Sequence, residues 1–244
     1  MTTPEGGTRD PRAVLAEVFG FPDFRGLQQQ AVAEVMAGRD CLVLMPTGGG
    51  KSVCYQVPAL ARPGTGLVIS PLIALMDDQV AALRQLGVNA GALHSEQEPE
   101  DAARVRSDLM AGRLDILYVS PERLLSPGML DRLGRLTLSV IAIDEAHCIS
   151  AWGHEFRPEY RELAALPQHF PNVPRIALTA TADARTRSDI LEALAMPDAT
   201  VLKASFHRPN LDIAVKPKTS EIRQLTAILD RHRGAASIVY CGSR

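Results

Sequence analysis

The chain has 244 residues, of which 46% are hydrophobic, so it can bury the core of one large domain or of one domain and part of a second. The formal net charge of -2 excludes a basic field over the whole surface, so any nucleic-acid contact has to be local. The four cysteines lie far apart and form no C-x-x-C pair, which predicts neither a zinc site nor a disulfide framework. Because no apolar run approaches roughly 18 residues, we expect a soluble, cytoplasmic protein without membrane contact.

Two helical patterns follow a polar tail, residues 1–9, which we expect to be disordered. Asp10 and Pro11 are typical of an N-cap and of the first position of a helix, and Gly20 is typical of its end. A second helical run spans residues 27–37. We therefore expect two helices before the first strand.

A strand pattern, a glycine-rich loop and a helix pattern then follow one another. The apolar run 41–44 fits a buried parallel strand, and residues 52–56 fit the start of a helix. The loop between them consists of Met45, Pro46, Thr47, Gly48, Gly49, Gly50, Lys51 and Ser52. This order of strand, loop and helix is the context that a phosphate-binding loop requires.

The residue types of this loop suit a nucleotide phosphate. Glycines allow backbone N–H groups to turn toward an anion, and the following helix adds its positive dipole end. Lys51 would reach the β- and γ-phosphates, and the Ser52 hydroxyl would bind Mg²⁺. The strict motif has glycine where this chain has Met45, and the alternative is a glycine-rich turn without a ligand.

An acidic pair, Asp144 and Glu145, follows a second apolar run at 138–143. At the carboxyl end of a parallel strand, such side chains face the ligand crevice of an open α/β sheet. Asp144 could hold Mg²⁺ through a water, and Glu145 could accept a proton from a water that attacks the γ-phosphate. The pair alone could also be a helix cap. Together with the loop, it favours nucleotide hydrolysis.

The remaining patterns alternate between short strands and longer helices. The expected strands are 67–69, 116–119, 140–143 and 176–178, and the expected helices are 75–86, 101–111, 159–166 and 184–194. This alternation predicts an α/β fold with a mostly parallel sheet and helices on both faces. A turn at 206–210 then precedes a new strand, helix and strand pattern from 211 to 240, which is too short for an independent domain.

Several long motifs occur in an order that resembles the RecQ family of superfamily 2, DEAH-box DNA helicases. The resemblance covers residues 15–244 and rests on the segments 15–28, 45–52, 70–80, 120–124, 144–160, 178–182, 206–210 and 238–244. It implies a RecA-like P-loop NTPase domain at 10–205, and a linker with the truncated start of a second RecA-like domain at 206–244. It also accounts for Met45, which that family's form of the loop contains.

For the nucleotide site, the resemblance implies that Phe24, Arg25 and Gln28 recognise adenine. The loop 46–52 would bind the phosphates of ATP, with Ser52 and Asp144 at Mg²⁺. The catalytic residues would be Lys51, Asp144, Glu145 and His147. His147 would link the acidic pair to the coupling motif, whose central residues are Thr179, Ala180 and Thr181. No zinc is expected in this chain.

For nucleic acid, the resemblance implies contacts along three segments and an aromatic-rich loop that senses single-stranded DNA. The residues are Ser70, Pro71, Gln79, Ser120, Pro121, Glu122, Arg123, Trp152, His154, Phe156, Arg157, Ser243 and Arg244. Trp152 and Phe156 offer faces for base stacking, worth about 1–3 kcal/mol per base, and Arg157 can pair with phosphate.

The function implied is an ATP-dependent 3′-to-5′ DNA helicase that acts on single-stranded and partly duplex DNA in repair and recombination, at the nucleoid if the source is bacterial. The remainder of the second domain would supply an arginine that promotes hydrolysis, so we expect this chain to bind ATP better than it hydrolyses it. One alternative is a nucleotide- and DNA-binding module with little helicase activity. A structural α/β protein or an unrelated P-loop kinase is a third.

Overall fold

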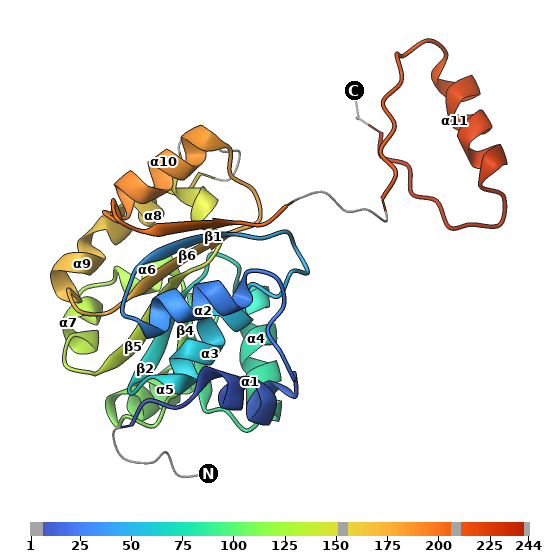
Figure 1. Cartoon of the computed structure of the whole chain (residues 1–244). Helices are drawn as coiled ribbons and strands as arrows, with labels where there is room; N and C mark the ends of the chain where they lie inside the picture. Colours follow the sequence, from blue (N-terminus) through green and yellow to red (C-terminus); the bar gives the residue numbers. More distant parts are fainter. Residues whose placement is uncertain (1–6, 151–155, 206–210, 242–244) are drawn as a thin grey trace. The chain divides into compact units, whose positions relative to one another are not determined.

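The computed structural model describes residues 7–150, 156–205 and 211–241. The chain divides into two compact units, Met1–Phe206 and His207–Arg244. The first contains a sheet of seven parallel strands in the order β3-β4-β2-β5-β6-β1-β7 (Figure 1). The strands are β1 (Cys41–Leu44), β2 (Thr65–Ile69), β3 (Ala90–Leu93), β4 (Ile116–Val119), β5 (Leu138–Ile143), β6 (Arg175–Thr179) and β7 (Thr200–Lys203).

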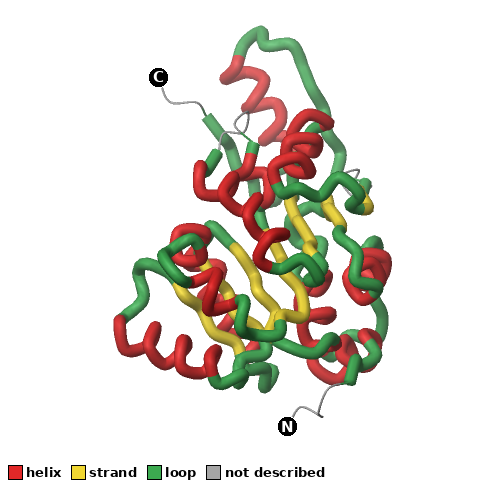
Figure 2. The backbone as a smooth tube through the Cα atoms, turned by 90° about the vertical axis from the view of Figure 1, so that its left-hand side faces the viewer, coloured by secondary structure: helices red, strands yellow, loops and turns green. Residues whose placement is uncertain are grey.

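Helices cover both faces of this sheet (Figure 2). One face packs against α2 (Gln28–Met36), α3 (Val53–Ala61) and α4 (Ile73–Gln85), with α1 (Pro11–Phe19) packed on α2 and α3. The other face carries α5 (Pro99–Met110), α6 (Pro121–Leu124), α7 (Met129–Leu133), η1 (Ala146–Ile149), α8 (Pro158–Glu162), η2 (Leu163–Ala165), α9 (Leu166–His169) and α10 (Ala184–Ala193). The predicted α/β class, with a parallel sheet between helices, is confirmed.

The strand residues divide between two hydrophobic cores by simple alternation. Leu42 and Leu44 face the core under α5 to α10, whereas Cys41 and Val43 face the core under α2 to α4. Because both faces are covered, the inner strands are continuous apolar runs, which is why their positions are evident in the sequence.

The caps predicted for the first helix are confirmed. The Asp10 carboxylate accepts a hydrogen bond from the Arg12 backbone N–H, and Pro11 is the first helical residue. Gly20 takes a left-handed conformation, with φ of 70°, and its N–H bonds to the carbonyl of Ala16.

Two strands, β3 and β7, were not predicted, and both lie at the edges of the sheet. β3 reads Ala-Gly-Ala-Leu and lacks the β-branched or aromatic residues that indicate a strand. A Cβ at Gly91 would lie 2.9 Å from a methyl group of Val105, so the close approach of α5 requires the glycine.

The helix predicted at 159–166 is wrong as a single element. The chain forms α8, η2 and α9 in succession, and Pro167 lies in the first turn of α9. Proline has no N–H to donate to the preceding turn, which suits Pro167 to the start of α9 and not to the interior of one longer helix.

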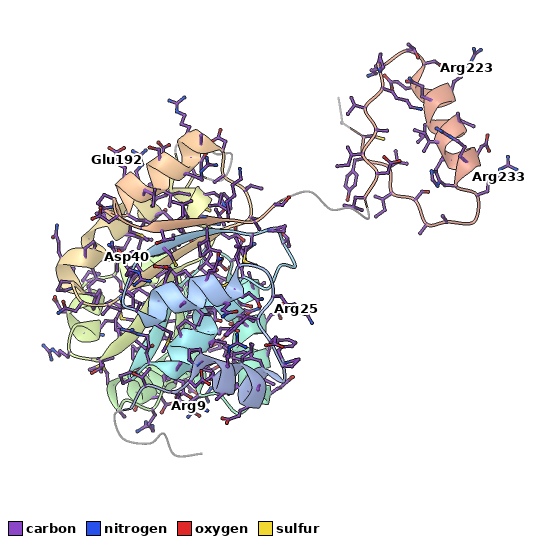
Figure 3. All side chains as sticks on the ribbon, in the orientation of Figure 1. Arg9, Arg25, Asp40, Glu192, Arg223 and Arg233 are labelled. Carbon is purple, nitrogen blue, oxygen red and sulfur yellow. The ribbon has the colours of Figure 1, made fainter. Side chains whose placement is uncertain are left out.

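In the second unit, the structure forms α11 (Glu221–Arg231), which carries Arg223 (Figure 3). The strands expected at 211–215 and 238–240 are not formed in the described part of this unit. Val215 and Tyr240 are each 92% exposed there. A strand is stabilised by hydrogen bonds to a neighbouring strand, and the described residues of this unit provide none.

Candidate active site

The carboxyl ends of the central strands bring together segments that are far apart in the sequence. Leu44 pairs with Thr179, and Ile69 pairs with both Val119 and Ile143. The segments that follow β1, β2, β5 and β6 therefore all leave the sheet at the carboxyl ends of the strands. In a parallel α/β sheet, the ligand crevice lies at these ends.

The glycines of the loop after β1 are required by its backbone. Gly48 and Gly50 have φ values of 78° and 74°, in the left-handed region. A Cβ at Gly49 would lie 2.9 Å from the carbonyl oxygen of Pro46, which accepts the Gly49 N–H. Side chains at these positions would strain or displace the loop, so the phosphate-loop interpretation has a conformational basis.

The loop borders a pocket of about 330 Å³ that also contains both acidic residues. The pocket is lined by Thr47, Gly48, Gly50, Lys51, Ser52, Tyr55, Ser70, Leu75, Met76, Gln79, Tyr118, Asp144 and Glu145. The ammonium group of Lys51 lies 3.3 Å from the carbonyl oxygen of Met45. One cation thus faces two carboxylates across a space that admits phosphate groups.

Gln28 begins α2 and is only 6% exposed. Its Nε2 donates hydrogen bonds to the carbonyl oxygens of Gly50, at 3.1 Å, and Gly49, at 3.4 Å. Its Oε1 accepts the Arg25 backbone N–H at 2.8 Å. Gln28 therefore ties α2 to the phosphate loop, a contact that sequence reasoning missed, and its reading of an adenine edge stays a prediction.

The other two adenine candidates lie close to Gln28 in the chain. Phe24 is half-buried against the cluster formed by α1, α2 and α3. The guanidinium of Arg25 lies 5.7 Å from the centre of the Phe21 ring, at the exposed surface of the unit (Figure 3). Phe24 thus packs on the core and Arg25 lies at the surface, and their roles in adenine recognition stay predictions.

Asp144 directly follows β5 and is 8% exposed. Burial, reinforced by the negative charge of Glu145, raises its pKa to about 6. The Glu145 backbone N–H, which bonds to Oδ1 at 3.0 Å, and the charges of Lys51 and His147 act in the opposite direction. A buried, incompletely neutralised carboxylate is suited to a cation that shares the site.

We expect Asp144→Asn to stabilise the protein at alkaline pH. The folded-state pKa of about 6 lies above the unfolded value, so ionisation costs stability as pH rises between the two, by roughly 3 kcal/mol in the limit. Asparagine keeps an oxygen that accepts the Glu145 N–H but carries no charge. Urea denaturation should show a gain of about 1–3 kcal/mol at pH 8 and little at pH 4. The exposed Asp198→Asn is the control, and a gain independent of pH would contradict the assignment.

Glu145, His147 and Thr179 form a hydrogen-bonded chain beside Asp144. His147 Nδ1 lies 3.3 Å from Glu145 Oε2 and 3.0 Å from Thr179 Oγ1. Thr179 Oγ1 donates to the Thr181 carbonyl at 3.1 Å and accepts the Thr181 N–H at 3.2 Å. Because the Thr179 hydroxyl donates its proton to the Thr181 carbonyl, it can only accept a hydrogen bond from His147. The imidazole of His147 therefore carries a proton on Nδ1.

Glu145 has both a shifted pKa and an unusual backbone conformation. The His147 hydrogen bond, opposed by burial and supported by Lys51, lowers the pKa of Glu145, so it is ionised at neutral pH. Its backbone is left-handed, with φ of 47°, which is uncommon for a residue other than glycine. Ala180 follows Thr179 at the end of β6, so the predicted coupling motif lies against the acidic pair through His147.

A hydrogen bond that the sequence did not indicate holds the backbone of the acidic pair. The buried Tyr160 hydroxyl of α8 donates to the Asp144 carbonyl oxygen at 2.9 Å. The Arg157 N–H, just before α8, bonds to the Cys148 carbonyl at 2.9 Å. Nothing in the sequence distinguishes this tyrosine from an ordinary core aromatic residue.

The candidate DNA contacts divide by exposure. Ser70, Ser120 and Pro121 are buried, and the Ser120 hydroxyl caps α6 by accepting the Arg123 N–H at 3.3 Å. Pro71 is also buried. Buried side chains such as these shape the surface without presenting polar groups to it.

The exposed candidates lie on two neighbouring segments. Glu122 and Arg157 are partly exposed and their charged groups lie 3.9 Å apart. Phe156 is 37% exposed, and the Arg161 guanidinium lies 5.4 Å from its ring centre. Arg123 and Gln79 are half-buried. The predicted contacts at Trp152, His154, Ser243 and Arg244 lie outside the described residues.

Among the described residues, no group of three or more His, Cys, Asp or Glu side chains is arranged to hold a metal ion. Ser52 and Asp144 nevertheless offer hard oxygen donors, and Mg²⁺ is commonly held by one or two protein ligands, substrate phosphates and waters. The donor set therefore fits Mg²⁺ in the presence of a nucleotide. The helices of the described part are all too short or too polar to cross a membrane.

Comparison with known proteins places this site in a family. The family model described as DEAD/DEAH box helicase matches residues 25–190. ATP-dependent DNA helicase RecQ of Haemophilus influenzae is 45% identical over 232 residues, covering 95% of this chain and 38% of that protein. ATP-dependent DNA helicase Q1 of Rattus norvegicus is 42% identical over 245 residues, covering 95% of this chain and 39% of that protein. The chain thus spans about two fifths of the length of these relatives.

The fold is also found among solved structures. That of Mycobacterium smegmatis helicase Lhr bound to ssDNA and AMP-PNP superposes with a TM-score of 0.61 at 23% identity, covering 80% of this chain and 28% of that one. It confirms the predicted RecA-like fold. The chain belongs to the DEAD/DEAH box helicase family. Within this family, the resemblance to RecQ helicases indicated by the motifs is confirmed.

Proposed function

We propose that this chain is the ATP-binding motor portion of a RecQ-type, ATP-dependent DNA helicase. The observation that carries the proposal is the shared pocket, in which Lys51 and Ser52 of the phosphate loop face Asp144 and Glu145. A phosphate-binding loop alone would suit many nucleotide-binding proteins. An ionised Glu145 held by His147 beside that loop supports hydrolysis in particular.

In this proposal the residues of the pocket divide the work of hydrolysis. The backbone of 48–50 and the Lys51 ammonium bind the phosphates of ATP. Ser52 and Asp144 hold Mg²⁺, which neutralises phosphate charge when it is bound. Glu145 orients the attacking water and accepts its proton, while His147 keeps the Glu145 carboxylate in place.

DNA is proposed to run along the segments after β2 and β4 and along the aromatic loop before α8. The exposed ring of Phe156 and the guanidinium of Arg157 suit stacking and phosphate contact. We propose single-stranded and partly duplex DNA as substrates, translocation from 3′ to 5′, and a role in repair and recombination in the cytoplasm, at the nucleoid in a bacterium. Zinc has no proposed role in this chain.

The test is steady-state ATP hydrolysis by the purified chain with and without single-stranded DNA. We expect DNA to stimulate turnover, and Trp152→Ala to keep basal turnover while removing most of the stimulation, because base stacking would be lost. The exposed Leu86→Ala, at the C-terminal end of α4, is the control. A Trp152→Ala protein that DNA still stimulates fully would reject the sensor role. Absent turnover with ATP binding intact would instead support the nucleotide- and DNA-binding module.

A further inference from the structure

Four polar side chains are linked at the floor of the candidate nucleotide pocket. Gln56 Nε2 donates to Gln79 Oε1 and to the Tyr118 hydroxyl, both at 2.9 Å. The hydroxyls of Tyr118 and Tyr55 lie 3.4 Å apart. Gln56 and both tyrosines are buried, whereas Gln79 is half-buried and lines the pocket. We call these four residues the Gln56 network.

The donors and acceptors of this network leave little freedom of orientation. Gln56 uses both hydrogens of its amide nitrogen, one for Gln79 and one for Tyr118. Burial raises the pKa of Tyr118 to about 12, so its hydroxyl stays protonated and can donate to Tyr55. Because a buried polar group that loses its partner is destabilising, these side chains are expected to move together.

The network starts in the helical turn that the phosphate loop begins. Gln56 and Tyr55 bond through their backbone N–H groups to the Ser52 carbonyl, at 2.9 and 3.2 Å. Lys51 also accepts at its carbonyl the Cys54 N–H, at 3.0 Å. A shift of Lys51 and Ser52 toward bound phosphate therefore moves the backbone that carries Gln56.

The network ends at both segments that are proposed to contact DNA. Gln79 lies in the middle of α4, the helix that follows Ser70 and Pro71. Tyr118 lies in β4, two positions before Ser120, where α6 is capped. Hydrogen bonds thus connect the helix after the phosphate loop to α4 and to β4, the elements next to the two segments proposed to contact DNA.

We propose that Gln56 and Tyr118 are positioning residues that couple nucleotide binding to DNA binding along the segments after β2 and β4. The inference rests on the proposed function and adds a route separate from His147 and Thr179. Nucleotide binding determines the position of Gln56. Through its two hydrogen bonds, Gln56 then determines the positions of the Gln79 side chain and of Tyr118 near the end of β4. By linkage, DNA on these segments raises nucleotide affinity by the same factor.

The test compares DNA affinity with and without a nucleotide in the full 244-residue chain. Fluorescence anisotropy of a labelled single-stranded oligonucleotide gives the Kd in the presence and absence of Mg²⁺ and AMP-PNP. We expect these two values to differ by about fivefold or more in the wild type. In Gln56→Met, which keeps the side-chain length but not the donors, the ratio should fall to within about twofold of one. Gln85→Met, at the exposed end of α4, is the matched control and should behave as the wild type.

Tyr118→Phe provides a second variant that removes one hydroxyl and leaves the ring in place. It should also lower the affinity ratio, and it keeps the test decisive if Gln56→Met does not fold. A wild type that binds both ligands with a ratio of one, or variants that retain the wild-type ratio, would overturn the coupling. A wild type that binds neither ATP nor DNA would overturn the proposed function itself.

Discussion

Lys51→Ala is expected to weaken ATP binding by about a hundredfold, or roughly 3 kcal/mol. The Lys51 ammonium is the cation that faces Asp144 and Glu145 in the pocket, and its charge favours the ionised form of both carboxyls. Without it, the phosphates of ATP lose a charged donor and meet two uncompensated carboxylates. Binding of a fluorescent ATP analogue, followed by anisotropy, measures the loss.

The matched control for this prediction is Lys216→Ala. Lys216 is an exposed lysine of the second unit, and the residues that line the candidate pocket all belong to the first. Circular dichroism should show the same helix content in both variants and the wild type, because Lys51 is half-buried at the loop and contributes little to the core. Unchanged ATP affinity in a folded Lys51→Ala protein would reject the assignment of the phosphate site.

Glu145→Gln is expected to lower ATP turnover by about 10²- to 10⁴-fold while leaving ATP bound. The Glu145 carboxylate is ionised because the hydrogen bond from His147 lowers its pKa, and it can therefore accept a proton at neutral pH. Glutamine has nearly the same shape and can accept from His147, but it cannot take up the proton of the attacking water. The defect should appear in kcat and not in the affinity for nucleotide.

Single-turnover hydrolysis with protein in excess over ATP measures this chemical step. Glu192→Gln is the control, because Glu192 is exposed on α10, outside the pocket (Figure 3). If Glu145→Gln hydrolyses ATP at the wild-type rate, Glu145 is not the base and the chain requires another acceptor for the proton. If it loses ATP binding as well, the residue contributes to the site mainly through its structure.

Sequence patterns located the elements that are buried on both sides. The strands at 41–44 and 116–119 were predicted to the residue, since inner strands of a covered parallel sheet are apolar throughout. The phosphate loop and the acidic pair were equally evident, because phosphate binding demands glycines with a lysine and serine, and hydrolysis demands carboxylates after a strand. Local chemistry therefore determined the fold class, the phosphate loop and the acidic pair, whereas the resemblance to the RecQ family implied the other candidate residues.

The tertiary structure decided the features that depend on partners distant in the sequence. The edge strand β3 exists because it pairs with β4, and the segments 211–215 and 238–240 form no strand where the described residues offer no neighbour. The same holds for the amide of Gln28 on the phosphate loop and the contacts of Gln56 with Gln79 and Tyr118. Propensity and motif act over a few residues, whereas a hydrogen bond between side chains requires the sheet to bring them together.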